Sequence, residues 1–391
     1  MQTRRAEAQA RRPTSLRVLA YVVDAHQPPS RAALAAATGL SRATVSATVD
    51  QLVDAGLLRE LDPVLTRRVG RPAVPLVPAS GTLAGIGMEI SADHVGVRVL
   101  DLGGAVLSER VDYADLRDAD PVAVVDRLAS LLDPVVEALD EQGVRTVGAT
   151  LALPGLVDQS SGVLHVAQTL GWRDLNLGEL LRTDRTLARL DPVLSDAAKL
   201  AALAEARSRE EESFVYVCGE AGVGGAVVLD RQVLSGAHGW AGAIGHIVVD
   251  PMLGADGTLE RLAGPDVLVR ASGLGPSART PALLAAIEAG DVRASEMVRR
   301  GGEMLGRALA SVVHVTDVST VVLGGAFWSL TDHLAPPLLA ELRRRVVLAP
   351  WVDFQVDRAH AGDLPALTGA AWMSVRRMLD DPRVFQALLD R

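Results

Sequence analysis

The chain has 391 residues, a length that predicts two or three domains. Hydrophobic residues make up 49% of it, which is enough for each domain to bury a sizeable core. A single cysteine, Cys218, excludes an intramolecular disulfide framework, and its thiol is expected to be buried and inert. The N-terminal segment is polar and rich in arginine, and no apolar stretch is long enough to cross a bilayer. We therefore expect neither a signal peptide nor a membrane span, and a cytoplasmic protein.

Charge is divided unevenly along the chain. Residues 1–72 contain eleven arginines and six acidic side chains, a net charge of +5. The whole chain carries −9, so the remaining residues carry −14. A basic head on an acidic body is typical of a protein that binds the phosphate backbone of DNA through its first segment.

The head is predicted to contain three helices, around residues 16–23, 31–38 and 41–55. The run from Gly39 to Ser46 resembles the turn and recognition helix of a helix-turn-helix protein. Gly39 can adopt the positive φ of a tight interhelical turn, and Ser41 can cap the next helix. An ordinary helical hairpin is the alternative. The helix residues expected to contact DNA are Ser41, Arg42, Ala43, Thr44 and Ser46.

A basic hairpin follows the third helix. An extended segment begins at Gly56, residues 66–72 form the predicted tip, and residues 74–77 form the return strand. This arrangement predicts a winged helix-turn-helix, with a domain boundary near Gly81. Arg67, Arg68 and Arg71 at the tip are expected to contact DNA, with Arg71 the best candidate for the minor groove. A solvated loop is the alternative.

From residue 83 onward, predicted strands alternate with helices in two similar halves. The first half has strands at 84–90, 95–100, from 105 and at 146–153, and helices at 121–139 and 197–209. The second has strands at 214–218, 225–229 and 320–323, and a long helix at 296–315. This order predicts a two-lobed α/β body with a central cleft. The expected domains are the winged head (1–79), a first lobe (80–196) and a second lobe (197–391) for oligomerisation and the effector cleft, with the last helix packing back on the first lobe.

Six short motifs follow one another along the chain in a specific order and spacing, at residues 153–158, 170–172, 195–198, 222–225, 241–246 and 254–260. Together with the winged head, they resemble the ROK family, which contains bacterial sugar repressors and sugar kinases. The resemblance covers nearly the whole chain. It implies an actin-like, ribonuclease-H-like ATPase fold with a sugar site in the cleft, in a homodimer or homotetramer.

Two departures from the family pattern concern cofactors. Where family kinases have an Asp-x-Gly-Gly-Thr loop that approaches ATP phosphates, this chain has the bulkier and more acidic run from Glu89 to Asp93. In the family zinc segment, Pro251, Leu253 and Thr258 replace the cysteines and only His246 remains. One imidazole cannot form a tetrahedral zinc site. We therefore expect no ATP, no metal and no other cofactor.

The sugar-binding residues that the resemblance implies are also partly replaced. Thr169, Ser195 and Ala243 stand at positions of an asparagine, an asparagine and a glutamate, whereas Asp196, His246 and Glu260 are retained. The expected effector site consists of Thr169, Ser195, Asp196, His246 and Glu260. Its ligand should have fewer or differently placed hydroxyls than a common hexose, because each unpaired buried polar group costs about 1–3 kcal/mol.

Each retained residue also has a purely structural alternative. Asp196 could only cap the helix that follows it, His246 could be a core histidine, and Glu260 could be a solvated helix residue. Trp172 is expected to pack at the rim of the cleft rather than to bind sugar.

The sequence thus predicts a DNA-binding transcriptional regulator, specifically a repressor, that binds a palindromic operator in double-stranded DNA. Its body is expected to sense a sugar-like molecule, and the chain is expected to have no catalytic residues. Two alternatives remain open. One is a sugar kinase with a DNA-binding head, in which Asp196 stands at the position of the general base. The other is a regulator that responds only to a protein partner.

Overall fold

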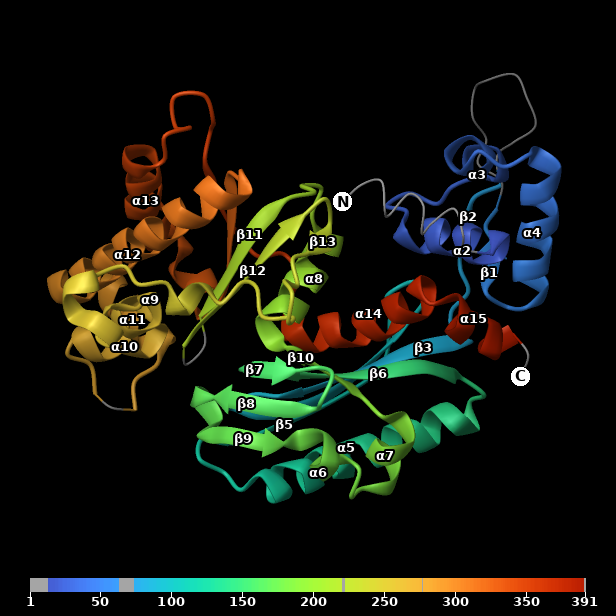
Figure 1. The fold of residues 1–391 in the computed structure, drawn as a ribbon, viewed down its shortest axis with the longest axis horizontal. Helices are drawn as coiled ribbons and strands as arrows, with labels where there is room; N and C mark the ends of the chain where they lie inside the picture. The colour runs from blue at the N-terminus through green and yellow to red at the C-terminus, as the bar shows by residue number, and fades with distance from the viewer. Residues whose placement is uncertain (1–12, 63–73, 220–221, 276, 390–391) are drawn as a thin grey trace.

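The computed structural model describes residues 13–62, 74–219, 222–275 and 277–389, with side chains described up to residue 386. A small N-terminal head lies beside a body whose two lobes are each built around a β-sheet (Figure 1). No helix in these ranges is long and apolar enough to cross a membrane.

The head is a helix-turn-helix with a wing, as predicted. Its elements are α2 (Thr14–Asp24), α3 (Arg31–Thr38), α4 (Arg42–Asp54), β1 (Leu58–Glu60) and β2 (Leu76–Pro78). Gly39 ends α3 with a φ of 69°, and the hydroxyl of Ser41 accepts the N–H of Thr44 at 3.1 Å to cap α4. The two wing strands pair antiparallel. Arg67, Arg68 and Arg71 of the predicted wing tip lie outside the described residues.

The first lobe contains a five-stranded sheet in the order β10-β6-β3-β4-β5. Its strands are β3 (Leu83–Ile90), β4 (His94–Asp101), β5 (Val106–Tyr113), β6 (Arg145–Leu153) and β10 (Val193–Asp196). The long helix α5 (Pro121–Glu141) packs its apolar face into the core of this sheet. A three-stranded sheet also covers this core, with β7 (Leu156–Asp158), β8 (Val163–Ala167), β9 (Trp172–Asn176) and the short helices η1 (Gln168–Leu170), α6 (Leu177–Leu181) and α7 (Arg185–Leu190).

The second lobe repeats this topology, which confirms the prediction of two similar halves. Its sheet has the order β13-β12-β11-β14-β15, with two antiparallel and two parallel pairings as in the first lobe. The strands are β11 (Phe214–Gly219), β12 (Val223–Leu229), β13 (Gln232–Val233), β14 (Thr320–Gly325) and β15 (Gln355–Arg358). The helices are η2 (Ile244–His246), η3 (Pro251–Gly257), α9 (Leu259–Ala263), α10 (Pro265–Ala271), α11 (Thr280–Glu288), α12 (Val292–Thr316) and α13 (Ala326–Arg345).

Two helices lie between the lobes, α8 (Ala197–Ser208) and α14 (Pro365–Asp380), and α15 (Pro382–Leu389) follows α14 (Figure 1). Helix α14 packs on β3, β6 and α8. The approach is close enough to require glycine, because a Cβ on Gly87 would lie 2.4 Å from the backbone nitrogen of Ala371. A Cβ on Gly369 would likewise lie 1.8 Å from the carbonyl oxygen of Leu200. Helix α14 is therefore fixed to the first lobe and to α8 at once.

The core of the head continues into the body. Trp372, Val375 and Met378 of α14 belong to the same apolar cluster as Leu16 and Leu19 of α2. The head is thus packed against the C-terminal part of the chain as well as being covalently joined to β3.

Candidate functional site

The exposed face of α4 is the candidate DNA-binding surface. Ser41, Arg42, Ala43 and Thr44 are exposed and Ser46 is half-buried, whereas Val45 and Val49 pack into the core. This division places the predicted contact residues on one accessible face at the start of the helix. The N-terminal residues of a recognition helix are those that reach base edges in a major groove.

Arg31 of α3 reduces the negative charge beside this face. Its guanidinium contacts Asp50 of α4 at 2.7 Å and Glu60 of β1 at 2.9 Å, and it donates to the carbonyl of Ser46 at 3.1 Å. Two carboxylates that would repel DNA phosphates are therefore paired. Arg42 forms no ion pair or side-chain hydrogen bond with the described residues, so its guanidinium is available to a partner.

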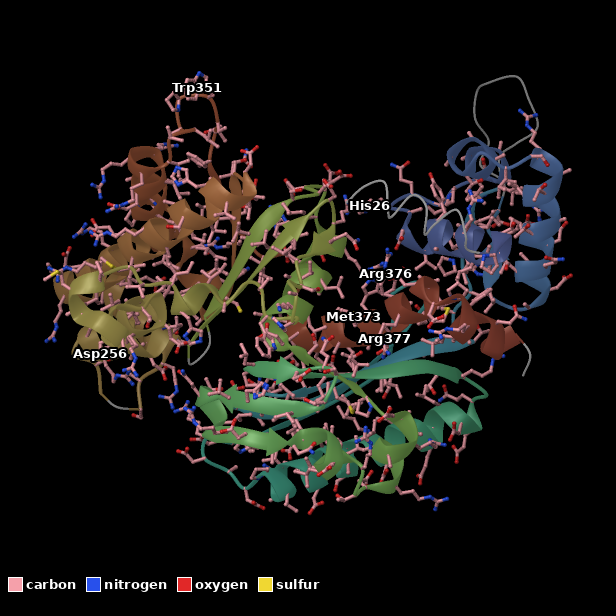
Figure 2. The ribbon with its side chains drawn as sticks, in the orientation of Figure 1. His26, Asp256, Trp351, Met373, Arg376 and Arg377 are labelled. Carbon is pink, nitrogen blue, oxygen red and sulfur yellow. The ribbon has the colours of Figure 1, made fainter. Side chains whose placement is uncertain are left out.

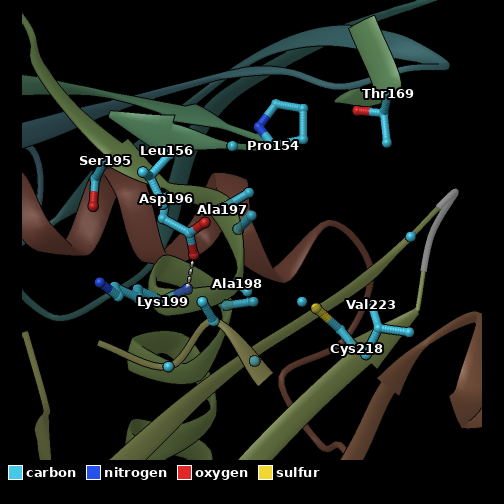
Figure 3. Close-up of a pocket in the computed structure, with 18 of the residues that line it drawn as sticks. Pro154, Leu156, Thr169, Ser195, Asp196, Ala197, Ala198, Lys199, Cys218 and Val223 are labelled. Carbon is cyan, nitrogen blue, oxygen red and sulfur yellow. Dashed lines mark hydrogen bonds between the residues drawn. The ribbon is translucent and has the colours of Figure 1, made fainter. Parts of the chain in front are cut away.

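The second candidate site is a cleft of about 370 Å³ between the lobes (Figure 3). Its walls come from the β3–β4 turn, β7, η1, β10, the start of α8, β12, η2 and α9. All five residues predicted for the effector site line it, namely Thr169, Ser195, Asp196, His246 and Glu260. The fold therefore brings together side chains that are up to 91 positions apart in sequence.

Asp196 is both a helix cap and a cleft residue. It ends β10, and its Oδ1 accepts the N–H of Lys199 at 3.0 Å in the first turn of α8, the contact drawn in Figure 3. Burial raises the pKa of Asp196 to about 6, against the opposing effects of this hydrogen bond and of the nearby Lys199 charge. The Nζ of Lys199 donates to the carbonyl of Gly239. Ser195 is buried beside Asp196, and its hydroxyl does not point toward that carboxylate.

The other three predicted residues occupy different walls. The Oε2 of Glu260 accepts the N–H of Val223 at 3.1 Å, which leaves the rest of the carboxylate for a ligand. His246 in η2 is exposed, so the alternative of a core histidine is wrong. The hydroxyl oxygen of Thr169 is buried and has no hydrogen-bond partner among the described residues. A ligand hydroxyl could satisfy it, since unpaired buried polar atoms are unfavourable.

A charged cluster that the sequence did not predict closes one end of the cleft. Glu89 at the end of β3 and His94 at the start of β4 are both buried, with Oε2 and Nε2 3.5 Å apart. The Nδ1 of His94 lies 2.7 Å from the exposed Asp93 carboxylate. Burial favours a lower pKa for His94, but the hydrogen bond with Asp93 and the nearby carboxylate of Glu89 raise it to about 10. The short β3–β4 turn, in which two acidic residues come shortly before a histidine, was the available sequence signal.

Trp172 packs as expected, although it does not line the cleft, whereas Trp240 and Cys218 line the cleft and were not expected there. Trp172 is buried and donates to the carbonyl of Ala119 at 2.8 Å, as expected of a packing residue. Trp240, which the sequence did not indicate, lines the cleft and donates to the carbonyl of Val157 at 2.9 Å. The expectation of a fully buried Cys218 is wrong, because it is partly exposed and lines the cleft. Its cross-strand neighbour Gly224 has no side chain to cover it.

No group of three or more His, Cys, Asp or Glu side chains suited to a metal ion occurs in the described parts of the chain. His246 stands in η2, and Pro251, Leu253 and Thr258 supply no sulfur or imidazole ligand beside it. These residues do not fit a zinc ion.

Comparison with known proteins identifies both parts of the chain. The model of the MarR family matches residues 12–68, and that of the ROK family matches residues 85–377. The "DNA-binding transcriptional repressor Mlc" of Escherichia coli K12 is 24% identical over 90% of both chains. An N-acetylmannosamine kinase of Shigella boydii is 29% identical over 70% of this chain and 97% of its own.

A solved structure described as a ROK family transcriptional regulator and homologue of the E. coli Mlc protein has a TM-score of 0.76 and 23% identity. It covers 96% of this chain and 98% of its own. The likeness thus includes the head and both lobes, whereas the kinase lacks a counterpart to about a third of the chain. From its matched residues and its two-lobed body, this chain belongs to the ROK family.

Proposed function

We propose that the protein is a transcriptional repressor that binds DNA through its winged head and a sugar-like effector in the cleft of its body. The single observation that carries this proposal is the combination of an intact helix-turn-helix with a cleft that retains Asp196, His246 and Glu260. The similarity to Mlc over both parts of the chain supports it.

The DNA site should be palindromic, because one winged head offers a small interface and a symmetric homodimer or homotetramer doubles it. Arg42, with Ala43, Thr44 and Ser46 beside it, is the proposed reader of base edges. Ser41 caps α4 through its hydroxyl and remains a proposed DNA contact at the start of the helix. The wing arginines, Arg67, Arg68 and Arg71, remain proposed contacts from the sequence, with Arg71 favouring A·T-rich minor grooves. A protein with this role is expected to act in the cytoplasm.

For the effector, we propose a neutral or weakly charged molecule with few hydroxyls. Asp196 and Glu260 can accept from its hydroxyls, His246 can donate or accept, and the Thr169 hydroxyl can be satisfied by it. Ala243 leaves apolar room where the family has a carboxylate. An effector acts only if it binds the DNA-competent and DNA-incompetent forms unequally.

We propose further that the body does not transfer phosphate from ATP. Asp196 stands where the family's general base stands, but Glu89 and Asp93 occupy the turn that would approach the phosphates. Their negative charges oppose a nucleotide, and the turn lacks glycines that would expose backbone N–H donors to the developing charge. A coupled assay with ATP and common hexoses should give no turnover, and elemental analysis should give no stoichiometric zinc. Measurable turnover would favour the kinase alternative.

The proposal is tested by selecting genomic DNA fragments with the full-length protein and then screening sugars and sugar derivatives for release of the selected fragment. The proposal expects enrichment of a two-fold symmetric site and release by at least one compound. Enrichment without release by any compound would favour the partner-controlled alternative. Failure to enrich any fragment would contradict the DNA-binding role.

A further inference from the structure

A second, larger cavity of about 950 Å³ lies where the head meets the body. It is lined by the end of α2 and the residues after it, by α8, by the β12–β13 turn and by one face of α14. Figure 2 labels His26 of the head and Met373, Arg376 and Arg377 of α14, which border it. None of its arginines belongs to the effector cleft.

Arg207 in the last turn of α8 is the most unusual charged group of this cavity. Its guanidinium carbon lies 3.3 Å from the ring centroid of the buried Trp372, a cation–π stack. Burial lowers the pKa of Arg207 to about 10, although the nearby Asp24 opposes this effect. The Arg207 side chain forms no ion pair or hydrogen bond with the described residues. A partly desolvated cation without a paired carboxylate is unfavourable, and an anion in the cavity would stabilise it.

No ion pair is formed between Arg207 and the described carboxylates of the cavity. Asp24 contacts Arg376 at 2.7 Å, and Asp380 contacts the same arginine at 3.4 Å. Glu212 lies 3.8 Å from Arg231, and both residues line the cavity. Asp230 also lines the cavity, on the β12–β13 turn.

Arg377 adds a second available guanidinium. It is exposed and lines the cavity, and its side chain forms no ion pair or hydrogen bond with the described residues. Arg207 uses the flat face of its guanidinium against Trp372, which leaves the N–H groups at its edge for a ligand in the same plane. This edge matches the geometry of a phosphate or a carboxylate, which arginine binds through two parallel hydrogen bonds.

We propose that this cavity is a second ligand site, which binds a small molecule bearing a phosphate or carboxylate group through Arg207 and Arg377. The bound anion competes with Asp24 for Arg376 and so weakens the polar contact between head and body. This inference rests on the geometry of the cavity and not on the proposed DNA-binding function, because anion binding is measured without DNA.

The test is calorimetric titration of the full-length protein with inorganic phosphate against chloride at equal ionic strength. We expect saturable phosphate binding that is at least tenfold weaker in Arg207→Met and several-fold weaker in Arg377→Gln. Arg300→Met is the control, because that side chain is exposed on α12 and does not line the cavity. Parallel titrations with succinate distinguish a carboxylate ligand from a phosphate ligand.

Arg377 is exposed, so its substitution keeps the test valid even if Arg207→Met folds poorly. Binding that is unchanged in Arg377→Gln or in a folded Arg207→Met, or no saturable binding of either anion, would overturn the site. Hydrogen–deuterium exchange tests the competition: phosphate should speed exchange of the amides near Asp24 at the end of α2. Unchanged exchange at saturating phosphate would overturn the link to the head.

Discussion

The carboxylate of Asp24, the last residue of α2, accepts hydrogen bonds from Nη1 of Arg376 in α14, at 2.8 and 2.7 Å. These two residues are 352 positions apart, and their contact joins the DNA-binding head to a helix of the body. The same helix packs on α8, whose N-terminal cap is Asp196 in the effector cleft. A chain of packed elements therefore connects the two candidate sites.

We expect the Asp24–Arg376 pair to contribute about 0.5–1 kcal/mol to the free energy of unfolding, because the Asp24 carboxylate is 43% exposed and solvent screens the attraction. Because Arg376 also contacts Asp380, a double-mutant cycle with Asp24→Asn and Arg376→Met isolates the pair. Denaturant unfolding of the four proteins gives the coupling energy. A value near zero would show that only apolar packing joins head and body.

Asp196→Ala should abolish the response to a verified effector while leaving operator affinity without effector within about twofold. The reason is that Asp196 faces the cleft, whereas the DNA face of α4 is far from it in the fold. Loss of the helix cap costs about 1 kcal/mol, so Asp196→Asn, which can still cap α8, is the matched variant. Effector titrations of the preformed DNA complex measure the response. A normal response in both variants would remove the cleft as the sensing site.

The raised pKa of Asp196 also predicts a pH dependence of stability. Its folded-state pKa of about 6 exceeds the ordinary value of 3.8, so ionisation disfavours the folded state. The penalty is absent below about pH 4, grows between pH 4 and 6, and is complete above this range, at up to about 3 kcal/mol. Asp196→Asn should therefore gain stability over the parent protein as pH rises through this window. A stability difference that is independent of pH would contradict this assignment.

The local parts of this structure could be predicted from sequence, and the long-range parts could not. Gly39, Ser41 and Asp196 act within one turn of their own helices, so their roles follow from residue type and position. The five residues proposed for the effector site, which line one cleft, were selected through family motifs that fix their order. By contrast, contacts such as Asp24 with Arg376 join distant segments, and no periodicity or motif in either segment specifies the partner.

The charged cluster of Glu89, Asp93 and His94, which stands where family kinases have their phosphate loop, also shows this difference between local and long-range features. The sequence showed that Glu89 and Asp93 replace a phosphate loop, but it did not show that His94 would be buried between them. That arrangement depends on the pairing of β3 with β4, which turns both side chains toward the cleft end.

His94 should remain protonated at neutral pH, because the flanking carboxylates raise its pKa to about 10. Because the pKa of His94 is raised in the folded state, protonated His94 contributes its full stabilisation below about pH 6.5. This contribution to the free energy of unfolding is lost as the pH rises toward 10. Glu89→Gln should lower the pKa of His94 by removing one carboxylate. Imidazole resonances followed by NMR between pH 6 and 11 measure the pKa of His94 in the parent protein and in Glu89→Gln. Ordinary titration of His94 near pH 6.5 would contradict the charged cluster.

The central claim, that the head reads DNA, is tested most directly by fluorescence anisotropy of the full-length protein on its selected DNA fragment. The comparison is between the parent protein, Arg42→Ala and the control Arg300→Ala, at low and at physiological salt. Arg42→Ala should lose about 1–3 kcal/mol of binding free energy with relaxed preference at one base pair, and the affinity of the parent should fall steeply with salt. Equal affinities for the parent and Arg42→Ala, with little dependence on salt, would contradict the account.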